Sequence, residues 1–145
     1  MMRLTVTVVA VALAAAGLAA QSVRTYKARL SVVPIDVAMQ ATIAGTGSVT
    51  AQLAGTKLTI TGTFNDLKTA ATVARIHVAA KGLRGPAILD LQVAGGTSGT
   101  ISGSFDLTKA QIEDLSQSRF YIQLHSEKAP DGNLRGWLLP QETRR

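Results

Sequence analysis

Apolar and polar residues alternate along most of this chain, in short stretches that are separated by glycine-containing turns. The clearest stretch is 57–64, in which Leu58, Ile60 and Phe64 alternate with threonines. A period of two residues is typical of an antiparallel strand with one buried face and one solvent face. The same pattern predicts strands over 26–33, 37–44, 48–53, 57–64, 73–79, 87–93, 100–105, 119–125 and 134–139.

One segment departs from this alternation. Thr108 is followed three residues later by Gln111, which is a capping-box spacing, and Ile112 and Leu115 supply an apolar stripe. This predicts one short helix near 108–117. Many short strands with a single brief helix predict an all-β fold, an antiparallel Greek-key-like β-sandwich of the immunoglobulin-like or Cu/Zn-dismutase-like type.

The first 20 residues predict a secretory signal peptide. Arg3 is followed by an apolar stretch over 4–18, and small residues at 17–20 offer a cleavage site. The stretch is shorter than the roughly 20 residues of a membrane span, although an uncleaved N-terminal anchor is the alternative. We therefore expect residues 21–145 to form one secreted or periplasmic domain, monomeric and with no transmembrane span after cleavage.

The composition of the chain excludes several classes of site and partner. The chain has no cysteine, so disulfides, thiolate metal sites and thiol nucleophiles are excluded. Its formal net charge is +6, but the basic residues are scattered, and aromatics are only 4% of the chain. Nucleic-acid binding is therefore not expected. A solvated basic surface is the favoured interpretation, and attraction to anionic headgroups or to an acidic envelope polymer is the alternative.

Two stretches, 74–91 and 121–139, share a plan. Each has a histidine at a strand end, then a glycine-containing turn, then Leu-Arg-Gly and an apolar run. In the second stretch the turn is expected at 130–132. We interpret the two stretches as related halves of one core, with His77 and Arg84 matching His125 and Arg135.

The two histidines are candidate metal ligands. Together with Asp131, His77 and His125 could bind Cu²⁺ or Zn²⁺. A structural zinc site uses four ligands, however, and this chain offers two imidazoles and a carboxylate. We therefore expect each histidine to be satisfied by backbone groups at its turn, and we expect no cofactor.

Three further residues are candidates for binding. Arg84 and Arg135 could act as guanidinium forks for a carboxylate, although ion pairs with Asp66, Asp90 or Asp106 are the favoured interpretation. Trp137 is the sole tryptophan. It could fill the rim of the core, or serve a carbohydrate or peptide partner if it is exposed.

No enzyme constellation is present in the sequence. His125 and Ser126 are neighbours on opposite faces of a strand, so they cannot form a nucleophile–base pair. The chain contains no G-x-S-x-G elbow, and its glycine-rich segments do not precede helices. We expect a protein without catalytic activity.

The order of motifs resembles the CHRD (chordin-type) domain, in the secreted single-domain form found in bacteria. The matching positions are Phe64, Leu67, Ile76-His77, Gly82, Gly85-Pro86, Leu89, Gly95, Ser98-Gly99, Phe105, Leu107-Thr108, Gln111, Leu115, Tyr121, His125-Ser126, Pro130, Gly132, Arg135-Gly136 and Leu138. Arg75 replaces the first histidine of the family's usual His-x-His pair.

The resemblance implies a β-sandwich, secretion and no established enzymatic activity. The expected function is a non-enzymatic binding or scaffold module of the cell envelope. Its partner would be an extracytoplasmic protein or an envelope polymer. The alternative is an extracytoplasmic copper- or zinc-binding module that uses His77 and His125.

Overall fold

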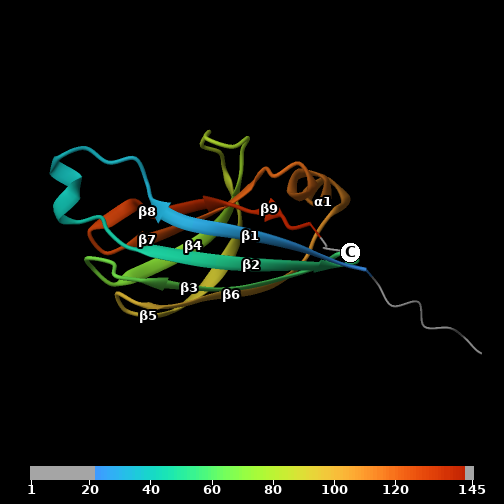
Figure 1. Ribbon diagram of the computed structural model, residues 1–145, viewed down its shortest axis with the longest axis horizontal. Helices are drawn as coiled ribbons and strands as arrows, with labels where there is room; N and C mark the ends of the chain where they lie inside the picture. Colours follow the sequence, from blue (N-terminus) through green and yellow to red (C-terminus); the bar gives the residue numbers. More distant parts are fainter. Residues whose placement is uncertain (1–21, 143–145) are drawn as a thin grey trace, which may run out of the picture.

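The computed structural model describes residues 22–142, so the predicted signal peptide lies outside the described residues (Figure 1). The strands are β1 (Val23–Val32), β2 (Thr46–Ala54), β3 (Lys57–Asn65), β4 (Ala71–Val78), β5 (Ala87–Gly95), β6 (Gly99–Asp106), β7 (Phe120–Ser126), β8 (Ala129–Trp137) and β9 (Leu139–Pro140). The helices are the 3-10 helix η1 (Ala38–Ala41) and the α-helix α1 (Lys109–Ser116). Neither helix is long and apolar enough to cross a membrane.

The strands close on themselves. Their order is β2–β3–β6–β5–β4–β7–β8–β1, and β1 also pairs with β2, which makes a closed antiparallel barrel with β9 added beside β1. The prediction of an all-β, antiparallel fold with one short helix is confirmed. The strands form one closed sheet instead of two separate ones, because β1 and β5 each pair with different neighbours at their two ends.

The core of the barrel depends on a small residue lying opposite a large one. Ile60 of β3 pairs with Gly103 of β6, and Gly62 pairs with Ile101. Both isoleucines are buried in the main core. A Cβ atom on Gly62 would lie 2.7 Å from a methyl carbon of Val49. The glycines therefore leave the space that their larger neighbours fill, as close packing requires.

Each end of the barrel carries a helix (Figure 1). At one end Thr108 and Gln111 form the predicted capping box of α1, and Leu115 enters the core. At the other end the prediction of a strand over 37–44 is wrong, because this segment holds η1. The side chain of Asp36 accepts a hydrogen bond from the Met39 N–H at 3.0 Å, which favours a local helical turn over strand pairing.

The hairpin of β7 and β8 also differs from its prediction. The turn lies at Glu127 and Lys128, since Ser126 pairs with Ala129. Pro130 and Gly132, expected in the turn, lie inside β8 at a register shift, and Gly132 has a φ of +131°. Proline and left-handed glycine are typical of such bulges. The bulge positions β8 against β7 along the face described next.

Candidate functional site

The outer face of β7 is buried although it lies outside the barrel. One set of alternate residues belongs to the main core: Phe120, Ile122 and Leu124. The other set faces outward, yet Tyr121 is only 2% exposed, Gln123 5% and His125 8%. Two polar side chains buried outside the core need partners, because an unpaired buried polar group costs about 1–3 kcal/mol. Gln123 and His125 find partners in β8 and lie next to each other, and the Tyr121 hydroxyl bonds to the loop 79–86.

A row of three rings crosses this face. His77 stacks on Tyr121 with ring centroids 4.8 Å apart, and Trp137 packs on the other side of Tyr121, also at 4.8 Å. The Tyr121 hydroxyl donates to the carbonyl of Gly85 at 3.1 Å, and the indole N–H of Trp137 donates to the carbonyl of Ala79 at 3.1 Å. The ring row therefore fastens the loop 79–86 to the face.

Both histidines bind backbone, as expected. Nδ1 of His77 lies 2.9 Å from the carbonyl oxygen of Gly85, and Nδ1 of His125 lies 2.8 Å from that of Pro130. A carbonyl accepts only, so Nδ1 carries the proton in each ring and Nε2 carries a lone pair in the neutral form. Nε2 of His77 is buried without a hydrogen-bond partner.

A chain of hydrogen bonds leads from His125 to Arg135. The Gln123 amide nitrogen donates to the main-chain carbonyl of Asp131 at 3.2 Å and lies 3.5 Å from Nε2 of His125. The Gln123 side-chain oxygen accepts from Nε of Arg135 at 2.8 Å. The guanidinium carbon lies 5.6 Å from the centroid of the Tyr121 ring. These contacts fix the orientation of Arg135. The bond to Gln123 uses only Nε, so the two terminal nitrogens of the guanidinium make no bond to Gln123.

The electrostatics of the site follow from burial. Burial lowers the pKa of Arg135, Tyr121 opposes that effect, and the nearby Arg84 guanidinium lowers the pKa further. Burial is also the largest cause of the lowered pKa of His125. Both basic groups are therefore held where the charged form is disfavoured, and an anion at the site would offset that penalty for Arg135.

The predicted ion pairs of Arg84 and Arg135 are not formed. Within residues 22–142 the salt bridges join Arg75 to Asp90 at 2.9 Å and Arg119 to Asp114 at 3.3 Å. Asp90 pairs with Arg75 because the two residues lie opposite each other on β4 and β5. The two candidate arginines are thus left without a carboxylate partner in the described part of the chain.

Arg84 and Arg135 line one pocket of about 430 Å³. The loop 79–86 supplies Arg84, and β8 supplies Arg135. The remaining lining residues are Val33, Pro34, Met39, Asp131 and Gly132. The pocket therefore has one apolar wall, two guanidinium groups and a single carboxylate, that of Asp131.

One known protein family matches most of the chain. The model of the CHRD domain matches residues 26–138, which includes all of the residues of the site. The chain belongs to the CHRD family. No curated protein and no solved structure matches it.

This CHRD domain does not bring its three candidate metal ligands together into one cluster. His77 lies beside Tyr121, whereas His125 lies four residues further along β7, and Asp131 joins the network through its main-chain carbonyl. No group of three or more His, Cys, Asp or Glu residues that could hold a metal occurs among residues 22–142. The backbone bonds of both histidines match the favoured expectation, and a metal site remains the alternative.

Gln123 and Tyr121 are the site residues that sequence reasoning missed. Both lie in the strand predicted over 119–125, on the face opposite to Phe120, Ile122 and Leu124, and the sequence alone predicts no role for them in a site. The available indication was that Tyr121, Gln123 and His125 all share that face, which is an unusual set for a fully solvated surface. Only the contact with the loop 79–86 shows that the face is covered.

Proposed function

We propose that this CHRD domain is a monomeric, non-enzymatic binding module of the cell envelope, and that it holds an anionic group of its partner between Arg84 and Arg135. The observation that supports this most directly is the state of Arg135. Its guanidinium is half-buried and fixed by Gln123, and no carboxylate in residues 22–142 pairs with it. A bidentate carboxylate would satisfy the remaining donors with charge-assisted hydrogen bonds.

The same pocket supports the absence of catalysis. Its lining includes no serine, threonine or histidine that could act as nucleophile or base. Nε2 of His125 faces the Gln123 amide, so its lone pair is occupied by a neighbour within the fold. CHRD domains are generally non-catalytic binding domains of the extracellular type. The expected signal peptide at 1–20 fits the same location.

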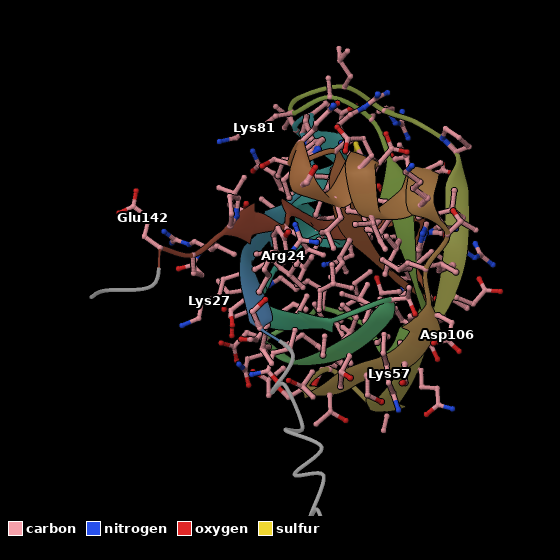
Figure 2. The ribbon with its side chains drawn as sticks, turned by 90° about the vertical axis from the view of Figure 1, so that its right-hand side faces the viewer. Arg24, Lys27, Lys57, Lys81, Asp106 and Glu142 are labelled. Carbon is pink, nitrogen blue, oxygen red and sulfur yellow. The ribbon has the colours of Figure 1, made fainter. Side chains whose placement is uncertain are left out.

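The test uses the purified domain and citrate as a polycarboxylate probe. Calorimetry should show saturable binding that weakens by roughly tenfold or more in Arg135→Gln and in Arg84→Gln, since each loses a charge-assisted contact. Lys57→Gln is the matched control. It removes one positive charge that does not line the pocket and that lies away from Lys27 and Lys81, and should bind as the parent does (Figure 2). Equal binding by all four proteins would contradict the proposal.

A second candidate function, binding of Cu²⁺ or Zn²⁺, has one favourable feature. Metal-ligating histidines commonly donate their other ring N–H to a carbonyl, as His77 and His125 both do. The absence of a third ligand nearby in the described chain makes it the weaker proposal. Calorimetry with each metal tests it: binding that disappears in His77→Ala and in His125→Ala would favour it over the anion proposal.

A further inference from the structure

A second hollow lies on the other side of Arg135. Its volume is about 300 Å³, and Arg135 lines both this hollow and the pocket shared with Arg84. Its other lining residues are Lys27, Arg29, Ser31, Lys81, Gly136, Trp137 and Leu139. No carboxylate lines it, whereas four cationic side chains do. The scattered basic residues of the sequence are therefore partly gathered here by folding.

Strand pairing explains why these cations share one surface. Lys27 and Arg29 are exposed at alternate positions of β1, while Ala28 between them is buried. Ser31 lies opposite Arg135 of β8, and Lys27 lies opposite Leu139 of β9. From Lys27 to Ser31 the strand extends about 13 Å, at roughly 3.3 Å per residue. The cations thus form a row that leads toward the Arg84 pocket.

The floor of the hollow is a fixed aromatic ring. Trp137 packs on Tyr121, and its N–H is bound by the carbonyl of Ala79, so its orientation is set before any ligand arrives. Leu139 continues the apolar floor. A sugar ring could pack its C–H face on Trp137, which offers a large contact area at low entropic cost. A carboxylate at the edge of that ring could then pair with the surrounding cationic side chains.

We propose that the two hollows are successive subsites for a linear polysaccharide that carries carboxylate groups. This inference rests on the anion-binding function proposed for Arg84 and Arg135. Sugar rings would pack on Trp137, and carboxylates would pair with Arg135 and with the row on β1. A repeated anion matches a row of cations along a strand better than a single headgroup does.

The experiment compares galacturonic acid with its hexamer. Trp137 is the sole tryptophan and lines the second hollow, so its fluorescence reports occupancy of that hollow, and calorimetry gives the overall affinity. The hexamer should bind at least about tenfold more tightly than the monomer, because contacts in the second hollow add to those in the first. Binding should weaken as salt is raised from about 20 mM toward physiological strength.

The decisive variant changes Lys27, Arg29 and Lys81 to serine together. Arg84 and Arg135 stay in place, so the monomer should still bind, whereas the higher affinity of the hexamer over the monomer should be lost. The matched control changes three exposed lysines that line neither hollow: Lys57, Lys68 and Lys109. It has the same net charge as the test variant and should keep the higher affinity for the hexamer.

The outcomes separate the two proposals. Equal affinity for monomer and hexamer would overturn the polysaccharide inference and leave the anion pocket standing. No binding of either compound, nor of citrate, would overturn both proposals. If polyphosphate, or vesicles with anionic phospholipid, bound more tightly than the galacturonate hexamer, the polysaccharide inference would be overturned in favour of that partner. If the control variant also lost the tighter binding of the hexamer, net charge alone would explain the attraction of the hexamer to the protein. That result would also overturn the inference.

Discussion

The Nε atom of Arg135 donates a 2.8 Å hydrogen bond to the side-chain oxygen of Gln123. This bond holds a half-buried guanidinium in one orientation. No carboxylate of residues 22–142 forms an ion pair with it, although Asp131 lines the same pocket. Gln123 can do so only because its own amide nitrogen is fixed by the carbonyl of Asp131. The proposed binding site would therefore depend on a buried neutral residue as much as on its charged ones.

The first prediction concerns Gln123→Leu. Leucine has a similar volume but cannot accept from Arg135, so a half-buried donor loses its partner. We expect a loss of roughly 1–3 kcal/mol in the free energy of unfolding. Citrate affinity should also fall, because Arg135 is no longer held in place. Urea denaturation and calorimetry measure the two effects.

Gln52→Leu is the control for this substitution. Gln52 is exposed on β2, so the same change should alter stability by no more than about 0.5 kcal/mol and leave citrate binding unchanged. A Gln123→Leu protein that binds citrate as the parent does would show that Arg135 needs no support from Gln123.

The second prediction concerns pH. Burial lowers the pKa of His125 most strongly, and Arg75 and His77 lower it further. The carbonyl of Pro130 and the carboxylate of Asp131 act in the opposite direction without cancelling the burial. Protonated His125 would also present a second N–H toward the amide nitrogen of Gln123, where no acceptor lies.

Stability should follow this shift. The pKa of His125 in the folded state lies below its ordinary value of 6.5, so the unfolded chain binds more protons as the solution becomes acidic. The contribution of neutral His125 to the free energy of unfolding is complete above pH 6.5. It is lost as the pH falls from there through the pKa of His125 in the folded state. The unfolding free energy should therefore fall more between pH 7.5 and pH 5 in the parent than in His125→Gln, which cannot titrate. Parallel pH profiles for the two proteins would refute this.

The third prediction concerns the cap of α1. The Thr108 hydroxyl accepts from the N–H of Gln111, and the Gln111 side chain accepts from the N–H of Thr108. Thr108→Ala removes the first bond and should cost about 1 kcal/mol. Thr108→Ser keeps the hydroxyl and should cost much less. Thermal unfolding of both variants makes the comparison, and equal losses would mean that the cap contributes nothing.

The sequence predicted those elements whose patterns are local. Residues 57–64 become β3 and 108–117 contain α1, because alternation and the capping box are set by neighbours in the chain. The strand prediction for residues 37–44 was wrong because their apolar residues resemble those of a strand. A hydrogen bond from the Met39 N–H to the Asp36 side chain instead favours the helical turn η1. Its exposed Val37 contributes to the strand pattern without entering the core.

For the candidate site, the sequence could indicate residues but not their arrangement. Arg84, Arg135 and Trp137 were singled out, and they do gather on one face. Their mutual arrangement depends on contacts between distant segments, such as that of Tyr121 with Gly85, which alternation does not encode. The same holds for the seam of β1 with β8, which closes the barrel and brings Lys27 and Arg29 beside Trp137.

The last prediction concerns that seam. A Cβ atom on Gly136 would lie 2.2 Å from the carbonyl oxygen of Arg29, which is backbone and cannot move aside cheaply. Gly136→Ala should therefore push β8 away from β1, at a cost of about 1–3 kcal/mol, the usual range for overpacking. Because the seam also walls the second hollow, the variant should lose the preference for a galacturonate hexamer.

Gly96→Ala is the matched control for the seam. Gly96 has no atom within 4 Å of the added methyl group and no positive φ, so this change should leave the melting temperature nearly unaltered. Gly136→Ala should lower that temperature by several degrees, as a cost of 1–3 kcal/mol implies for a domain of roughly this size. If both alanine variants have the same melting temperature, β1 and β8 have room to separate at Gly136. The closure of the barrel would then not depend on that glycine.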